Sequence, residues 1–292
     1  MLGIVGILCV LGLVFGGYAL AGGKFGIIIK ALPFELMMIG GAALGTFLIA
    51  NGGHVLKGAL GDLKRVFSGP KWNKDDYRDL LCLMFMLVKI LKTKGVLAIE
   101  PHVENPHEST LFARYPKIQH DHHALDLIAD TLRMMTMSMD DPYQVEDCIL
   151  RQLKKQHNEH HAHSNALQAI ADGLPALGIV AAVLGIIKTM GSIDQPVEVL
   201  GGMIGGALVG TFLGVYLAYG FIGPMTNRVN QTYESDGQFY AIIKDCFVAY
   251  LQGHSAPVSV ELARGNVPSI FQPSFADLDE VLNELPADPL AA

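Results

Sequence analysis

The sequence predicts an all-α integral membrane protein with four transmembrane helices and a helical cytoplasmic domain. Of its 292 residues, 51% are hydrophobic and only 17% are charged, whereas charged residues make up about 25% of a typical soluble domain. Four long runs without Asp, Glu, Lys or Arg approach or exceed the roughly 20 residues with which a helix crosses a bilayer. No strand-rich block, fixed-period repeat or low-complexity tract interrupts this pattern.

The same composition excludes several other classes of protein. The apolar content is too high for a disordered chain, and a formal net charge of −7 argues against a basic surface that binds nucleic acid. A secreted domain held by disulfides is excluded because the four cysteines are scattered and form no CxxC pair. They are Cys9, Cys82, Cys148 and Cys246.

Three of the uncharged runs are uninterrupted and cover residues 2–21, 36–53 and 199–227. The remaining run, residues 173–187, is shorter, but Lys188 can reach the headgroups while its stem stays in lipid. We therefore expect transmembrane helices at about 2–21, 33–53, 172–193 and 199–223. The first run is not a typical signal peptide, although Ala19-Leu20-Ala21 resembles a cleavage site, because no Lys or Arg precedes Lys24.

Basic residues near the span ends predict the orientation of the chain. Six of them flank the ends that adjoin residues 54–169, and two lie in the first short loop. By the positive-inside rule, both termini are cytoplasmic. The chain then divides into two spans in residues 1–53, a cytoplasmic domain at 54–169, two spans in 170–227, and cytoplasmic C-terminal helices with an acidic tail at 228–292.

The cytoplasmic part is expected to be helical. Residues 80–88 are continuously apolar and too few to span, which predicts a helix at 75–92 buried between others. Ser274 followed by Asp277 is a capping signature for an amphipathic helix. Further helices are expected at 121–139 and from Pro142 to about residue 163, and three prolines make residues 100–118 a turn-rich connector.

Seven of the eleven histidines form two groups, and imidazoles three or four residues apart on a helix can share a zinc ion. Neither group has cysteine or carboxylate neighbours in an obvious ligand spacing, which favours a solvated helix end, with a zinc-binding membrane protein as the alternative. The groups are His120, His122 and His123, and His157, His160, His161 and His163.

The spans carry small residues instead of charges. Glycines recur at intervals of four in the fourth span and at Gly41 and Gly45 in the second, a pattern typical of closely packed membrane helices and, over a whole span, of a multi-subunit assembly.

Glu35 and Asp172 are expected at helix starts, so we expect no carboxylate in the middle of a span. An ion relay normally needs one, so a partner would supply it. Hydroxyls that could help to pass an ion are those of Thr46, Thr189, Thr211 and Tyr216.

Several long motifs occur in order along the chain. Residues 172–185 read DGLPALGIVAAVLG, residues 209–224 read VGTFLGVYLAYGFIGP, and the loop contains Glu104-Asn105-Pro106. In these motifs the chain resembles the MotA family of flagellar-motor stator subunits. Residues 40–51 and 273–275 are consistent with the same family. The resemblance covers most of the chain.

The resemblance implies a multi-pass protein of the bacterial inner membrane that acts in flagellar rotation, motility and chemotaxis. It implies a homo-oligomeric ring of five subunits in the membrane lipid around two copies of MotB, a single-span protein whose intramembrane Asp carries the ion. It also implies a channel that turns ion flow into torque on the rotor protein FliG. No enzymatic activity, cofactor or resident metal is expected.

The resemblance also assigns roles to individual residues. Pro175 and Pro224 match two prolines that couple ion flow to conformational change, and Thr211 matches a threonine that faces the ion path. Glu100 matches an acidic rotor contact, and Lys92 lies where arginine is common. Lysine keeps the charge but lacks the planar bidentate fork of arginine.

Gly210-Thr211 and Ala181-Ala182 resemble members of the family that use protons, so H⁺ is favoured over Na⁺ as the coupling ion.

An energiser of the ExbB or TolQ type is the alternative function; these proteins have three spans as a rule, and the fourth uncharged run argues against them. A membrane-embedded enzyme would need a polar catalytic constellation, and no nucleophile elbow, HExxH motif or P-loop occurs.

Overall fold

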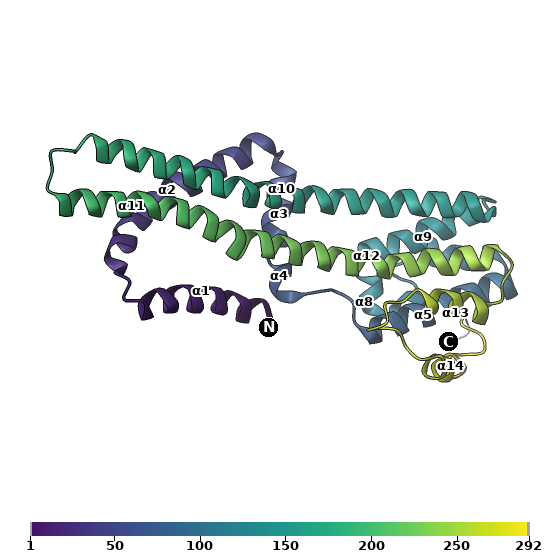
Figure 1. Ribbon diagram of the computed structural model, residues 1–292. Coiled ribbons are helices and arrows are strands. Elements are labelled where there is room, and N and C mark those ends of the chain that lie inside the picture. Colours follow the sequence, from purple (N-terminus) through teal and green to yellow (C-terminus); the bar gives the residue numbers. More distant parts are fainter. Residues whose placement is uncertain (1, 291–292) are drawn as a thin grey trace. The chain divides into compact units, whose positions relative to one another are not determined.

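The computed structural model describes residues 2–290, and no strand occurs among them (Figure 1). Two compact units are present, each built from two segments of the chain. The membrane unit comprises the residues up to 69 together with 159–232, and the core unit comprises 70–158 together with the described residues from 233 onward. Helices long and apolar enough to cross a membrane are Gly3–Leu20, Phe25–Ala50, Pro142–Met190 and Val197–Leu251. The predicted fold class is confirmed.

Among the described residues, the first segment of the membrane unit forms four helices, and the second contributes one complete helix, one π-helical turn and parts of two longer helices. The first segment forms α1 (Leu2–Leu20), α2 (Phe25–Ala50), α3 (Gly53–Asp62) and α4 (Arg65–Ser68). The second contains the C-terminal part of α10 (Pro142–Met190), α11 (Val197–Leu217), the π-helical turn η2 (Ala218–Ile222) and the start of α12 (Gly223–Leu251).

The second span begins at Phe25, several residues before its expected start near residue 33. A search for uncharged runs stops at Glu35, but the helix continues through Glu35, Pro33 and Lys30. The buried residues of α2 are Glu35, Ile39, Ala43 and Phe47, and their spacing of four residues places them on one face. The charged residue therefore belongs to the packed face of the helix.

α10 is one continuous helix, although the sequence predicted separate helices at 142–163 and 172–193. Residues 164–171 contain no glycine or proline that would end a helix, and Pro175 lies within the helix. Helical structure is likewise continuous from Val197 to Leu251. C-terminal helices were expected from residue 228 onward, and the first of them, in α12, continues the fourth span without a break.

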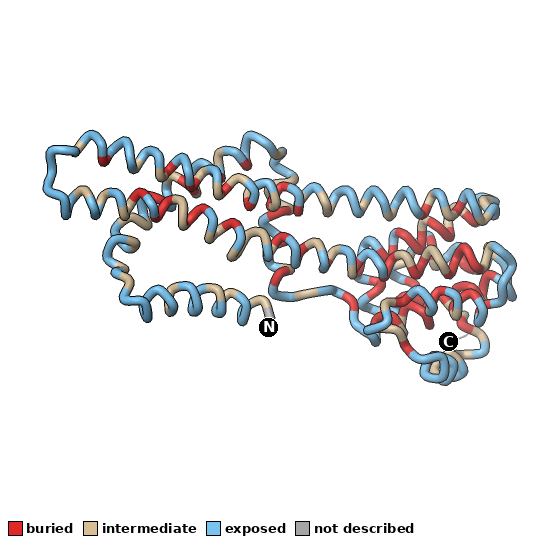
Figure 2. The backbone as a smooth tube through the Cα atoms, viewed as in Figure 1, coloured by how far each residue is buried: buried red, intermediate tan, exposed pale blue. Residues whose placement is uncertain are grey.

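The membrane unit has a small interior and a large apolar exterior. Its main buried cluster joins Ile39 of α2, Leu174 and Ala181 of α10, and Leu213 of α11. The apolar stretch of α1 has no buried residue, and Figure 2 shows most of this helix as exposed. Such exposed apolar surfaces are suited to contact with lipid or with neighbouring membrane helices, because both surroundings are apolar.

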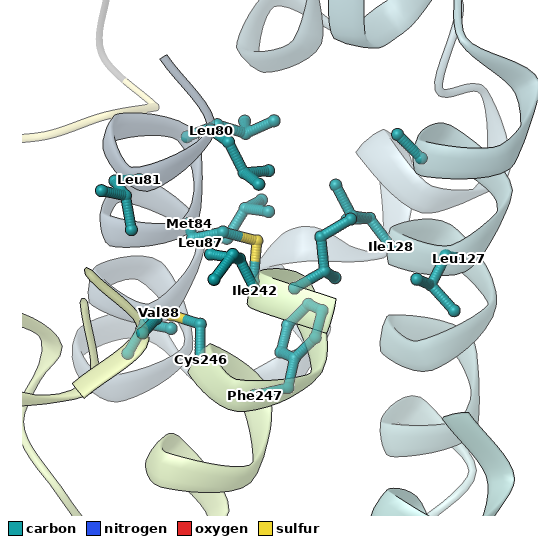
Figure 3. Packing of buried hydrophobic residues seen from close by; sticks show 14 of the residues in the cluster. Leu80, Leu81, Met84, Leu87, Val88, Leu127, Ile128, Ile242, Cys246 and Phe247 are labelled. Atoms are coloured by element: carbon teal, nitrogen blue, oxygen red, sulfur yellow. The ribbon is translucent and has the colours of Figure 1, made fainter. Parts of the chain in front are cut away.

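The core unit surrounds α5 (Lys74–Lys94), whose apolar residues 80–88 are largely buried as predicted. Figure 3 shows Met84 and Leu87 of α5 facing Ile128 of α9 (His122–Thr136) and Ile242 of α12. Full burial of one such side chain contributes about 1.5–3 kcal/mol. The unit also contains η1 (Val96–Ile99), α6 (Glu100–Glu104), α7 (Thr110–Ala113), α8 (Pro116–Gln119), the first part of α10, α13 (Ala256–Gly265) and α14 (Phe275–Glu284).

Side chains at the helix ends explain where two of these helices begin. The Asn73 side chain accepts a hydrogen bond from the Asp76 amide at 3.1 Å, and the Asp76 carboxylate accepts one from the Asn73 amide at 2.7 Å. This capping box satisfies amide groups that the first turn of α5 leaves free. At α14, Ser274 accepts from the Asp277 amide at 3.1 Å, which confirms the predicted cap.

Candidate functional site

The backbones of α10 and α11 come into direct contact within the membrane unit. A Cβ atom at Gly178 would lie 2.8 Å from the Gly210 carbonyl oxygen and 3.1 Å from the Cα atom of Gly214. One at Gly214 would lie 2.5 Å from the Leu174 carbonyl oxygen. The two backbones therefore touch, as the glycine pattern predicts for this part of the fourth span.

Other glycines of the same pattern have no neighbour within the chain. A Cβ atom at Gly201 or Gly202 of α11 would meet nothing within 4 Å, and the same holds for Gly41 and Gly45 of α2. These positions could accept close contact from another helix without steric conflict. The expectation that these stripes serve contacts between subunits stays a prediction.

Glu35 joins the contact between α10 and α11 from the side of α2. Its side chain is only 5% exposed, and a Cβ atom at Gly210 would lie 2.5 Å from Glu35 Oε2 and 3.2 Å from Ala181 Cβ. The expectation of a carboxylate-free span interior is wrong here, because α2 begins ten residues before Glu35 and carries it inward. Three helices thus meet around one carboxyl group.

A cavity of about 780 Å³ lies beside this carboxyl group. Its wall is formed by α2, α10, α11 and the residues just before α2. Glu35 lines it together with Lys24, Lys30 and Lys188, and most of the remaining lining is apolar or glycine. The three lysines are exposed and Glu35 is buried.

Of the four hydroxyls singled out in the spans, three make hydrogen bonds to backbone carbonyls. Thr46 donates to Ala43 at 3.0 Å, Thr189 donates to Gly185 at 2.9 Å, and Tyr216 donates to Val10 of α1 at 3.1 Å. Thr211 is half-buried, and its hydroxyl has no hydrogen bond to any residue that the structure describes. It is the hydroxyl of this set that is available to an ion or a partner.

Both prolines assigned to coupling lie at irregular points of long helices. Pro175 lies inside α10 next to Leu174, whose carbonyl touches α11, and it cannot donate the usual hydrogen bond to Ala171. Pro224 is exposed and lies two residues after the end of the π turn η2, and the amide of the intervening Gly223 donates a hydrogen bond to the Ala218 carbonyl. π turns within α-helices often occur at functional sites.

Comparison with known proteins relates almost the whole chain to motility proteins. Residues 4–95 match the family model for the N-terminal part of motility protein A, and residues 119–240 match that of the MotA/TolQ/ExbB proton channel family. Motility protein A of Escherichia coli is 38% identical over 280 residues, which cover 96% of this chain and 94% of that protein. The chain belongs to the motility protein A family. Chemotaxis protein LafT of Vibrio parahaemolyticus is 32% identical over 96% of this chain and 98% of its own length.

Solved structures of the motility protein A family have the same fold. C. jejuni MotAB matches with a TM-score of 0.72 at 17% identity, over 91% of this chain and 95% of that one. The flagellar MotAB stator complex of Bacillus subtilis matches with a TM-score of 0.68 at 19% identity, over 88% and 92%. The resemblance stated from the motifs is therefore confirmed at the level of family and fold.

The two residues that the motility protein A resemblance assigns to the rotor lie in the core unit. Lys92, in the last turn of α5, donates a hydrogen bond to the Gly253 carbonyl at 3.0 Å and lies 5.3 Å from the ring centre of Tyr250. Glu100 is the first residue of α6. Both side chains are exposed, so both can meet a partner, and their rotor role stays a prediction.

The histidine group at 120–123 is exposed, as expected for a solvated helix end, whereas His160, His161 and His163 of the second group are half-buried. His163 Nδ1 lies 3.0 Å from Asp62 Oδ2, and its side chain is only 13% exposed. A Cβ atom at Gly58 would lie 2.2 Å from His163 Cε1, so glycine is what allows α3 to approach α10 here. Within residues 2–290 no group of three His, Cys, Asp or Glu side chains is placed to hold a metal ion.

Sequence reasoning missed Glu35, although a signal was present. Ile39, Ala43 and Phe47 follow it at intervals of four, which is the spacing of one helix face. An acidic residue that begins such a series belongs to the packed side of the helix. The search for uncharged runs excluded it at the outset.

Proposed function

We propose that this chain is the stator subunit of a bacterial flagellar motor, forming with a MotB-like protein an ion channel that converts ion flow into torque. The observation that carries the proposal is the 38% identity to a motility protein A over 96% of the chain. The match includes α10 and α11, which hold the backbone contact and the free hydroxyl of Thr211. An ExbB or TolQ energiser is the less favoured function, since the relatives matched over the full length are motility proteins.

The partner is a single-span protein that brings an Asp into the membrane beside Thr211. A homo-pentamer around two partner chains fits the many apolar side chains of α1 and the open glycines of α2 and α11. We place the assembly in the bacterial inner membrane, with both termini and the core unit in the cytoplasm. The chain is not an enzyme and takes no cofactor.

In this function an ion enters from outside, binds the partner's Asp near Thr211, and changes how α10 and α11 pack on the partner. Pro175 and the π turn before Pro224 are the points at which these helices can bend with little loss of hydrogen bonding. A membrane potential of about 100 mV supplies roughly 2.3 kcal/mol per charge, which is enough to bias a two-state change in packing. Lys92 and Glu100 then transmit force to FliG.

The proposal is tested by complementation of a strain that lacks its own stator subunit. Wild-type chain should restore swimming and co-purify with a single-span partner that has an intramembrane Asp. Thr211→Ala should reduce or abolish swimming while the partner is retained. Thr46→Ala is the matched control because the Thr46 hydroxyl bonds within its own helix. Failure of the wild-type chain to restore swimming, with flagella intact, would contradict the proposal.

A further inference from the structure

Glu35 is held inside the membrane unit with an unpartnered oxygen. The residue is 95% buried, and its Oε2 atom is fully buried and has no hydrogen-bond partner in the described chain. Gly210 and Ala181 provide the space that the carboxyl group fills. A larger residue at Gly210 would occupy the position of the oxygen.

The charged groups that share the cavity with this carboxyl are lysines. Lys24 precedes α2, Lys30 belongs to α2 and Lys188 to α10, while α11 contributes no titratable side chain to the lining. Lys30 precedes Glu35 by five residues, which turns it about 140° away around the helix. No described lysine or arginine forms an ion pair with Glu35.

An ionised carboxylate without a partner is costly to bury, because apolar surroundings do not replace its hydration. The inexpensive form is the neutral acid, which carries a proton. The cavity and its exposed lysines act in the opposite direction, since water and positive charge favour the ionised form. A carboxyl group placed between these two influences can both take up and release a proton.

We infer that Glu35 is a proton-binding site of this chain, loaded and unloaded through the cavity beside it. The ligand is H⁺, and the site is separate from the carboxylate that the partner is proposed to bring. Gly210 and Thr211 are consecutive in α11 and point about 100° apart, so the two carboxyl groups would lie against neighbouring faces of one helical turn. A role for Glu35 in ion flow rests on the proposed function; the proton site itself does not.

The proton site is tested by labelling the assembled complex in native membranes with dicyclohexylcarbodiimide. A protonated carboxyl adds to this reagent: its oxygen bonds to the central carbon, the acid proton moves to a nitrogen, and rearrangement gives a stable N-acylurea. Mass spectrometry of the peptide that contains Glu35 measures the product. We expect labelling to increase by at least about tenfold between pH 9 and pH 6, because each of these three pH units changes proton occupancy by up to about tenfold.

Glu198, in the first turn of α11 and exposed, is the internal control, because it is a glutamate of the membrane unit without the burial of Glu35, and its labelling should stay low at every pH. Glu35→Gln removes the acidic group with little change of volume and should remove the product. Absence of labelling at Glu35, or equal labelling at every pH, would overturn the inference. Because the wild-type protein gives the main result, a variant that fails to fold does not affect it.

Swimming tests the part that Glu35 plays in ion flow. We expect Glu35→Gln to swim at least about twofold more slowly than wild type at alkaline external pH, with the partner still bound, and Glu35→Asp to recover part of the speed. Glu198→Gln should swim normally. Equal speeds for Glu35→Gln and wild type at every pH would exclude a part in ion flow. If the wild-type chain restored no swimming, the proposed function would fail while the labelling result stood.

Discussion

Gly178 and Gly214 occupy positions where a single methyl group would collide with main-chain atoms. Gly214→Ala places a Cβ atom 2.5 Å from the Leu174 carbonyl oxygen, so α10 and α11 must separate. We expect a loss of about 1–3 kcal/mol in stability, measured as a lower melting temperature of the purified complex. Gly201→Ala is the matched control, since its Cβ atom would meet nothing within 4 Å; equal melting temperatures for both variants would contradict the packing described.

His102 makes the stability of the core unit depend on pH. Burial lowers its pKa from the ordinary value of 6.5, and its Nδ1 atom lies 2.8 Å from Ser109 Oγ. The unfolded chain therefore binds more protons than the folded chain below about pH 6.5, so stability falls as the pH falls through this range. Thermal unfolding between about pH 8 and pH 5.5 should show the effect, and His102→Gln should reduce it. A variant with the full wild-type dependence on pH would exclude His102 as the cause.

Some of the site residues could be predicted from sequence and others could not. Thr211 and Pro175 lie within long motifs, so their positions follow once the motif is matched. Glu35 was assigned to a helix end because charge was used to define the span. Whether a charged residue is buried depends on the space left by Gly210 on another helix, which no single span reveals.

Hydrogen bonds in the first turn of a helix contribute to the stability of the core unit. Asn73→Ala removes the side chain that accepts from the Asp76 amide, and loss of such a cap costs about 1 kcal/mol. We expect a corresponding drop in stability by thermal or chemical unfolding. Ser255→Ala is the control because Ser255, the residue before α13, makes no capping hydrogen bond. Similar losses for both variants would show that the capping box of α5 contributes little.

Helix positions were predicted well where caps or apolar spacing mark them and poorly where helices continue. α5 and α14 have cap residues in the sequence, and both begin where expected. α10 has no stop signal between its polar and apolar halves, so one helix was read as two. The change from polar to apolar composition marks the edge of a membrane, whereas a helix ends only where its pattern of backbone hydrogen bonds ends.

At the scale of the whole molecule, the proposed rotor contact predicts that reversing its charges lowers torque and leaves folding unchanged. Lys92→Glu together with Glu100→Lys should reduce torque strongly while expression and partner binding persist, because both side chains are exposed. Arg151→Glu is the control, since Arg151 is an exposed cation paired with Asp147 on α10. Bead rotation on tethered flagella measures torque. Unchanged torque in the double variant would exclude this contact.

The coupling ion is also a property of the whole assembly. Swimming should follow the proton gradient and not respond to external sodium, because Gly210-Thr211 and Ala181-Ala182 resemble the members of the family that use protons. Speed measured across sodium concentrations at a constant proton gradient tests this. Speed that rises with sodium would favour Na⁺.

The family-level function and the four spans could be predicted from sequence because they depend on long motifs and on apolar composition. The alternation of two membrane segments with two cytoplasmic segments was also expected from composition. The contacts that join the two segments within each unit could not be predicted, because they are made between residues far apart in the chain. The residues that join α2, α10 and α11 lie in separate motifs. Only their packing brings Glu35, Ala181 and Gly210 together.

The π turn at Ala218–Ile222 contains one residue more than an α-helical turn needs. If this turn took regular α geometry, the helix after it would rotate about its own axis by about 100° and shift by about 1.5 Å relative to α11. A change of register in a few backbone hydrogen bonds would then become a rotation of α12. Such a rotation would need no bend in the axis of α12.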